Sequence, residues 1–423
     1  MKYIHFKQFL EQLGRNKFFT FLNLFGISIP LMIIMLMVLQ IDLSIHPSGP
    51  EEENEQMLFL NATRIKSSEG GYARGKVHLG IIERYFLDKA PDESLAFSAV
   101  SSLTRFETSR VMDIPLRYTN AGFWQVFDFR FLEGRSYTRE NVEHGDQVIV
   151  ISQKIRHQVF DNTQAVGKTL ELNGHTCRVI GVVEDVSSLG RNTYAQVWLP
   201  YTLRSNPSFN PRGMGGATGD YTLTFKTTED WNFQDIREHV ASVASKLNNI
   251  MGEDREFIFG GPSSAAETYF RGYRDPEAYS GLLSSYLGMA GKILVILFLP
   301  ALNLISLNLT RIQEKSHEIA IRKAFGATRK NLIVRVMLEN SVLTLIGGII
   351  GLLMAYGVAV AFKSHIFSSY FIETPAQAIV QMNYGVFFVL ILVSFLFSVL
   401  SGLIPSIRIS RLQPAYVLKG GAL

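Results

Sequence analysis

Four long apolar runs, separated by polar sequence, constrain this chain more than any other feature. They are Phe18–Leu39, Met289–Leu309, Ser341–Phe362 and Tyr384–Ile404. The first is about 22 residues long, and at about 1.5 Å per residue an α-helix of that length crosses a hydrocarbon core of about 30 Å. The sequence therefore predicts an integral membrane protein with four transmembrane helices.

The first run is followed by Ile41-Asp42-Leu43 and not by a small-x-small cleavage site, which predicts an uncleaved anchor. Pro30 and Pro300 lie inside the first two runs. Proline is tolerated in membrane helices, with a kink, because neighbouring groups satisfy the carbonyl that it frees.

Basic residues indicate the orientation of the helices. They gather before the first run, between the second and third, and after the fourth, as Lys2, Lys7, Arg15, Lys17, Arg311, Lys315, Arg322, Lys323, Arg329, Lys330, Arg335, Arg408, Arg411 and Lys419. Between the third and fourth runs the only basic residue is Lys363. Because cytoplasmic loops carry the excess of Lys and Arg, both termini are predicted to be cytoplasmic and residues 41–285 extracytoplasmic.

The composition supports a division of the chain into three parts. They are residues 1–40, with the first helix, residues 41–285, an inserted domain, and residues 286–423, with the other three helices. Charged residues make up 18% of the 423 residues, against about 25% in soluble proteins. The deficit lies in the four runs, while the inserted domain reads as ordinary soluble sequence. The net charge of +4 is weak evidence for a nucleic-acid partner, and none is predicted.

The inserted domain reads as mixed α+β. It opens with a polar exit segment, residues 47–56, that contains four glutamates. Runs typical of strands follow at Met57–Ala62, Gln147–Ser152 and Cys177–Val183, with a short helix at Gln153–Phe160 and another at Arg271–Tyr286. Asn173-Gly174, directly before the third strand, predicts a hairpin turn.

No catalytic or metal site is predicted. Gly167-Lys168-Thr169 resembles the end of a phosphate-binding loop, but the glycine required five places before Gly167 is absent. His157, His175 and Cys177 lack the paired spacing of a zinc site. The single cysteine excludes an internal disulfide and is interpreted as a small apolar strand residue.

Residues 311–339 form the most informative connection, RIQEKSHEIAIRKAFGATRKNLIVRVMLE. Apolar residues among charges predict a short amphipathic helix over Glu314–Phe325, with Gly326 as its end and Thr328 as a cap for the next helix. A basic loop that lies against the membrane is the alternative. On the third apolar run, Gly347, Gly348 and Gly351 give a small-residue face suited to close helix packing.

Several segments resemble the FtsX-like permease domain of MacB-type ABC transporters. They are residues 15–29, 308–357, which contains EIAIRKAFGA, and 401–421. Residues 123–138 and 148–186 resemble the periplasmic core domain of the same family. The tail departs from the family pattern, since Pro405-Ser406-Ile407-Arg408-Ile409 replaces a proline–alanine–arginine–arginine–alanine motif.

The resemblance implies a permease subunit of an ABC transporter in a bacterial inner membrane, working as a lever to export or extract a peptide, antibiotic, lipid or lipoprotein. It implies that the amphipathic helix is a coupling helix that docks on a separate ATPase, which holds ATP and Mg, so that this chain is not itself an enzyme. The implied coupling residues are Glu318, Ile319, Ile321, Arg322, Lys323, Phe325, Gly326 and Ala327. A second permease copy or paralogue is expected, and a periplasmic adaptor and outer-membrane protein are further partners of such systems.

Three alternatives remain. An FtsX-like regulator of cell-wall hydrolases would share the permease domain without transporting anything. A membrane-anchored sensor would need an output domain after the second predicted helix, but two further apolar runs follow that helix instead. A membrane-bound enzyme would need a catalytic constellation in the inserted domain.

Overall fold

The structure is a computed structural model of the 423-residue chain. It describes residues 17–47, 49–87, 89–91, 93–101, 114–161, 163–172, 174–187, 190–211, 216–271, 287–296 and 328–361, together with isolated residues at 283, 298, 385, 388, 392 and 395. These divide into two compact units. The helix unit comprises the described residues within Met1–Ile41, Leu287–Ile366 and Met382–Leu423, and the outer unit comprises those within Asp42–Tyr286.

The helix unit contains two helices long and apolar enough to cross a membrane. Helix α2 (Lys17–Ile45) continues through Pro30, and its final residues belong to the outer unit. Helix α10 (Arg329–Ala361) begins directly after Thr328. The candidate spans within them are Thr20–Ile45 and Ser341–Ala361, and a shorter apolar helix covers Leu287–Ile296. The other predicted spans lie mostly outside the described residues, so a count of four stays a prediction.

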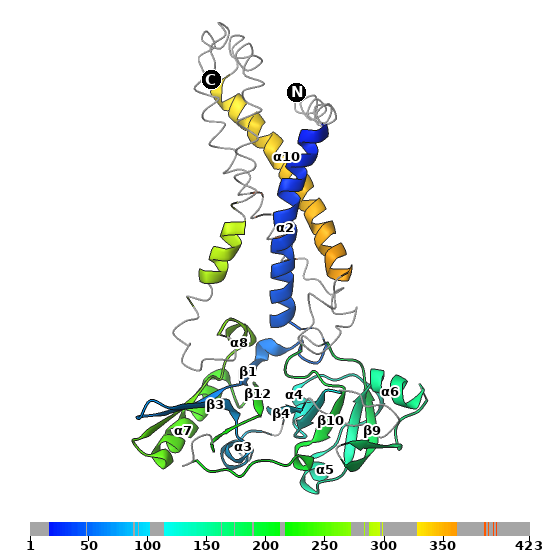
Figure 1. The fold of residues 1–423 in the computed structure, drawn as a ribbon, viewed down its shortest axis with the longest axis vertical. Helices are drawn as coiled ribbons and strands as arrows, with labels where there is room; N and C mark the ends of the chain where they lie inside the picture. The colour runs from blue at the N-terminus through cyan, green and yellow to red at the C-terminus, as the bar shows by residue number, and fades with distance from the viewer. Residues whose placement is uncertain are drawn as a thin grey trace. The chain divides into compact units, whose positions relative to one another are not determined.

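The outer unit is built on two sheets (Figure 1). Among the described residues the larger sheet has nine strands, ordered β1-β12-β4-β5-β10-β7-β9-β6 with β8 paired to β9. Their bounds are β1 Met57–Leu60, β4 Leu95–Ser101, β5 Leu116–Thr119, β6 Phe131–Gly134, β7 Val148–Ser152, β8 Thr169–Leu172, β9 His175–Val183, β10 Val197–Pro200 and β12 Thr222–Lys226. The pairs β5–β10 and β7–β9 are parallel, and the other pairs are antiparallel.

The smaller sheet has the order β11-β3-β2-β13 in the described part of the chain. Its strands are β2 Thr63–Ser67, β3 Tyr72–Val77, β11 Thr218–Gly219 and β13 Arg255–Phe259. The helices of the outer unit are α3 Leu79–Tyr85, α4 Phe123–Val126, α5 Arg139–Glu143, α6 Gln153–Phe160, α7 Phe233–Met251 and α8 Ala265–Arg271, with short 3-10 turns η1 Asn54–Gln56 and η2 Tyr201–Leu203. In Figure 1, β3 and α7 lie towards one end of the unit, and β9 and α6 lie towards the other.

Helix α7 shows how the sequence builds this unit. Ile236, Val240, Val243 and Leu247 recur at helical spacing and are buried, so one face of the helix enters the core with the small sheet. The Asn232 side chain accepts from the backbone amides of the first turn in a capping box. Tyr201, which follows β10, packs against each of the three apolar clusters formed by the described residues of the outer unit.

Local predictions in the outer unit are confirmed where the structure describes them. The predicted strands correspond to β1, β7 and β9, and the predicted short helix is α6. Leu172 stands opposite His175 in the β8–β9 pair, and Gly174 has a φ of +81°, as a two-residue hairpin requires. The helix predicted over Arg271–Tyr286 lies almost entirely outside the described residues.

Candidate functional site: the helix contact and the junction of the outer unit

The predicted coupling residues, Glu318, Ile319, Ile321, Arg322, Lys323, Phe325, Gly326 and Ala327, lie outside the described residues. Their proposed contact with an ATPase therefore stays a prediction. The described parts of the chain contain two other features that bear on how motion passes along it. One is the contact between α2 and α10, and the other is the point where the outer unit holds the segment that leaves α2.

Helices α2 and α10 cross at the predicted glycines (Figure 1). An added Cβ at Gly347 would lie 2.7 Å from Ile27 Cγ2, and one at Gly351 would lie 2.9 Å from the Ser28 carbonyl oxygen. At Gly348 the nearest atom is Leu31 Cδ1 at 3.9 Å. Gly347 and Gly351 thus lie where no side chain fits, whereas Gly348 lies beside the contact.

A hydrogen bond fixes the same contact. The buried Ser28 hydroxyl of α2 donates to the Gly347 carbonyl at 2.9 Å. On α10 the glycine spacing continues through Ala355 and Ala359, which are buried. Small residues let membrane helices approach closely, and a serine bond between helices adds to such packing. Ser28 and the two alanines were absent from the sequence prediction.

Residues 47–56 were predicted to be a polar exit segment. The structure shows that this segment, which follows α2, is anchored in the outer unit. The Asn54 side chain donates to the carbonyl of Ile45, the last residue of α2. Glu51 and Asn54 are each 3% exposed. Glu53, by contrast, is exposed and pairs with Lys226 at 2.7 Å. Of this acidic run, Glu51 faces inwards because it has hydrogen-bond donors there.

Glu51 binds the loop that precedes β10. Its Oε1 accepts from the backbone amides of Asn192 and Thr193 at 2.9 and 2.8 Å and from the Thr193 hydroxyl at 2.8 Å. Its Oε2 accepts from Asn192 Nδ2 at 3.2 Å. We call residues 190–194 the clamped loop. A buried carboxylate with four donors is well satisfied, as a buried charge must be.

A buried guanidinium holds the other side of the clamped loop. Arg117 of β5 is 3% exposed and donates to the carbonyls of Arg191 and Tyr194 at 2.9 to 3.1 Å. It also donates to the Ser98 hydroxyl of β4 at 2.8 Å. The loop thus gives its amides to a carboxyl group and its carbonyls to a guanidinium. It connects the segment after α2 to the middle of the large sheet.

The returning end of the outer unit meets the same loop. The guanidinium of Arg191 lies 6.0 Å from the ring of Tyr269 on α8, the last described helix before the second apolar run. Just before α8, Ser263 exchanges two backbone hydrogen bonds with Phe59 of β1 at 2.7 and 3.0 Å. The segment that follows α2 and helix α8 at the other end of the unit therefore both contact the clamped loop.

Burial raises the pKa of Glu51 above its ordinary value of 4.5, and the four donors oppose that rise. The folded unit then holds this proton at a pH where the unfolded chain has lost it. The part of the stability that comes from this raised pKa is fully present below about pH 4.5 and is lost as the pH rises through the folded-state pKa. We therefore expect the unfolding free energy of the wild type to fall, relative to Glu51→Gln, as the pH rises from 4.5. Urea titrations of both proteins at pH 5 and pH 8 would measure this, and parallel curves would contradict it.

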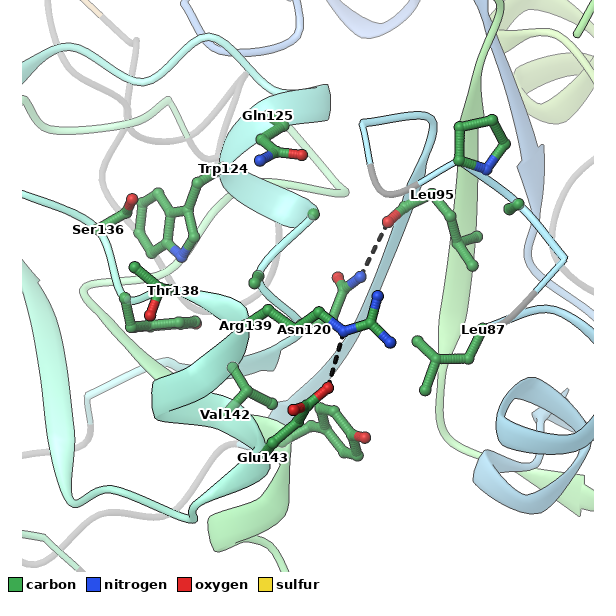
Figure 2. A pocket seen from close by; sticks show the side chains of 16 residues that line it. Leu87, Leu95, Asn120, Trp124, Gln125, Ser136, Thr138, Arg139, Val142 and Glu143 are labelled. Atoms are coloured by element: carbon green, nitrogen blue, oxygen red, sulfur yellow. Dashed lines mark hydrogen bonds and ion pairs between the residues drawn. The ribbon is translucent and has the colours of Figure 1, made fainter.

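A hollow of about 230 Å³ opens where β4 begins and β5 ends (Figure 2). Leu87 and Leu95 lie on one side of it, Trp124 lies across from them, and Arg139 is bonded to Glu143 at 2.7 Å. Both ends of the Asn120 amide are bonded, because it donates to the Leu95 carbonyl at 2.9 Å and accepts from the Phe97 amide at 3.0 Å. Apolar walls with a few polar groups suit part of a small amphipathic molecule.

Lys168 and Cys177, from the incomplete phosphate-loop and zinc patterns, have structural roles. Lys168 donates to the Thr163 hydroxyl at 2.7 Å and lies 5.0 Å from the centre of the Phe160 ring. Cys177 is buried in β9, which confirms its interpretation as a small apolar strand residue, and burial raises the pKa of its thiol to about 11.

Two helices long and apolar enough to cross a membrane, with a folded α+β unit inserted after the first of them, fit a membrane protein with a large extramembrane domain. The MacB-like periplasmic core domain family matches residues 20–243, more than half of the chain, and the FtsX-like permease C-terminal family matches residues 292–414. The chain belongs to the MacB/FtsX-like family of ABC transporter permeases.

Similar proteins include two from Bacillus subtilis that are described as uncharacterised ABC transporter permeases. YknZ is 26% identical over 73% of this chain and 70% of its own length. YvrN is 23% identical over 88% of this chain and 84% of its own length. The macrolide export ATP-binding/permease protein MacB of Neisseria gonorrhoeae is 23% identical over 60% of this chain, which spans 37% of that protein.

Solved structures that match part of this chain include the periplasmic region of MacB from Actinobacillus actinomycetemcomitans, at 18% identity and a TM-score of 0.33 over 47% of this chain and 88% of that one. The extracellular domain of YknZ gives 18% identity and a TM-score of 0.32, over 47% of this chain and all of that one.

Proposed function

We propose that this chain is the transmembrane permease subunit of an ABC transporter of the MacB type. In this proposal, motion driven by a separate ATPase passes through α2 to the outer unit, which then exports or extracts a substrate. One observation carries the proposal. The clamped loop is held by Glu51, in the segment that follows α2, and contacts Tyr269 of α8, which precedes the second apolar run. A shift of either segment would therefore act on the same buried loop.

The proposed topology has four spans in a bacterial cytoplasmic membrane, with both termini inside and residues 41–285 outside. The distribution of basic residues supports this orientation. The contact at Gly347 and Gly351 supports a transmission path in which α2 and α10 move as a packed pair. If one helix slid along the other, larger side chains would replace these glycines at the contact and would clash with α2.

The proposed partners follow from the family. An ATP-binding subunit would carry ATP and Mg, and a second permease, identical or a paralogue, would complete the assembly with membrane lipids around it. An adaptor and an outer-membrane protein would be needed only where a second membrane is present. The family match over residues 20–243 favours a transporter over an FtsX-like regulator of cell-wall hydrolases, because it extends through most of the outer unit.

Charge reversal in the coupling segment gives the test. We expect the tagged wild-type chain, purified in mild detergent, to bring an ATP-binding subunit at a near one-to-one ratio. Glu318→Lys and Arg322→Glu should each reduce that subunit at least tenfold, because they place like charges at the rim of the contact. Quantitative mass spectrometry measures the ratio.

The control is Lys246→Glu, which makes the same size of charge change on the exposed face of α7. It should leave the ratio unchanged. If no ATP-binding subunit accompanies the wild type in several detergents, or if the reversals act no differently from the control, the transporter proposal fails.

A further inference from the structure

The hollow at the start of β4 and the end of β5 lies between two apolar clusters of the outer unit. Leu87 and Leu95 on one side belong to the cluster that α7 enters. Trp124 and Val142 on the other side belong to a second cluster, and Tyr201 packs against both. Packed protein interiors leave few voids larger than a water molecule. A gap of about 230 Å³ therefore marks a place where the two clusters do not close on each other (Figure 2).

Neighbouring rings hold the aromatic walls of the hollow in place. The Trp124 ring meets the rings of Tyr137 and Phe129 edge-on, with centroids 5.4 and 4.9 Å away. The Tyr201 ring meets that of Phe97 in the same way at 4.9 Å. Tyr137, which also lines the hollow, is almost fully buried. The walls are thus set by the fold before any ligand arrives, as is usual for sites that bind small molecules.

The size of the hollow limits what can enter it. An apolar cavity of about 150 Å³ is large enough to hold benzene. Sites that enclose a whole drug-sized molecule measure about 300–1,000 Å³. At about 230 Å³ the hollow lies between these values. It can therefore take a group of one or two aromatic rings, and it cannot enclose a whole macrocycle.

The mouth of the hollow is polar on the side of α5. A capping box at Thr138 fixes the start of this helix, and Arg139 and Glu143 are bonded one turn apart at 2.7 Å. Their side chains are 51% and 61% exposed, and Glu140 beside them is also exposed. Charged residues are depleted where an anchor side chain of a partner protein enters a surface. A small molecule with a solvated polar end fits this mouth better.

We propose that the hollow binds a compact apolar group of a small amphipathic molecule, whose polar part stays in water beside Arg139 and Glu143. The further assignment of this molecule as the transported substrate, or as part of it, rests on the proposed function. Binding itself needs neither the ATPase nor a movement of the helices. A chain that binds no such molecule would leave the transporter proposal standing, and a chain that binds it without an ATPase partner would leave this one standing.

Fluorine NMR of the full chain labelled with 5-fluorotryptophan, in detergent micelles, tests the proposal. The probe is 2-phenylethanol, which carries one ring and one hydroxyl. The chain has three tryptophans, and Trp124 is the one among them that lines the hollow in the described structure. We expect its resonance, assigned with Trp124→Phe, to shift saturably with a dissociation constant on the order of 1 mM. The resonance of Trp231, which packs on Phe225, should not move.

Filling the hollow should prevent binding. Ala121 and Ala90 line it, so Ala121→Phe and Ala90→Phe should each weaken the binding of 2-phenylethanol at least tenfold. The matched control is Ala241→Phe on the exposed face of α7, which should bind like the wild type. An unchanged Trp231 resonance shows that a variant is folded, and if one filling variant does not fold, the other decides.

Three results would overturn the proposal. The first is a Trp124 resonance in the wild type that does not shift, or shifts without saturation. The second is an equal shift of Trp231, which would mean that the probe acts through the detergent and not through the hollow. The third is unchanged binding in a folded filling variant.

Discussion

Replacing Glu51 by alanine is expected to lower the unfolding free energy of the outer unit by about 2–4 kcal/mol at neutral pH. The substitution leaves two backbone amides, a hydroxyl and a side-chain amide without their acceptor in a buried place. Urea unfolding followed by tryptophan fluorescence would measure the loss. Trp198 is a local reporter, since its Nε1 donates to the Thr193 carbonyl at 3.2 Å.

Glu51→Gln is the matched control, and it should stay within about 1 kcal/mol of the wild type. A glutamine oxygen can take the place of Oε1, which accepts the three shortest bonds. Its amide nitrogen would face Asn192, whose side-chain amide can turn to present its oxygen. If alanine and glutamine give the same stability, Glu51 does not hold the clamped loop in the way described.

Replacing Gly351 by leucine is expected to destabilise the packing of α2 on α10 by about 1–3 kcal/mol. Its Cβ alone would lie 2.9 Å from a backbone oxygen of α2, so the helices must separate and the Ser28–Gly347 bond must break. Reversible unfolding in mixed micelles with increasing dodecyl sulfate would measure the loss. We expect Gly347→Leu to behave in the same direction, since its neighbour is the side chain of Ile27.

The control for helix packing is Gly357→Leu on the same helix. No atom lies within 4 Å of a Cβ added there in the described structure. Leucine also has a higher helix propensity than glycine at every one of these positions, so propensity alone would stabilise all three variants. Equal behaviour of the Gly351 and Gly357 variants would show that the close approach contributes nothing.

Local patterns in the sequence predicted the parts of the fold that depend on local chemistry. The β-branched run of β7, the helix α6 that follows Ser152, and the hairpin at Gly174 each follow from neighbouring residues. The strands of the small sheet were not predicted. Their polar alternation, as in TRIKS, becomes a sheet only because Ile65 and Val77 find a core supplied by α7 and the large sheet.

The contact between Glu51 and the clamped loop could not be predicted, for a similar reason. Glu51 stands among three consecutive glutamates, a run typical of a solvated linker. Only the fold shows that the amides of Asn192 and Thr193, more than a hundred residues away, point at one of them. Ser28 is equally inconspicuous within an apolar run, whereas the glycines at 347 and 351 were identified by spacing alone.

The central claim is that ATP-driven motion reaches the outer unit through the clamped loop. Hydrogen–deuterium exchange of the purified complex of this chain with its ATPase tests it directly, because the amides of Asn192 and Thr193 are the ones bonded to Glu51. We expect exchange in residues 190–194 to differ between ADP and ATP with orthovanadate, and this difference to be lost in Glu51→Ala. Identical exchange in both nucleotide states, in a complex that hydrolyses ATP, would contradict the claim.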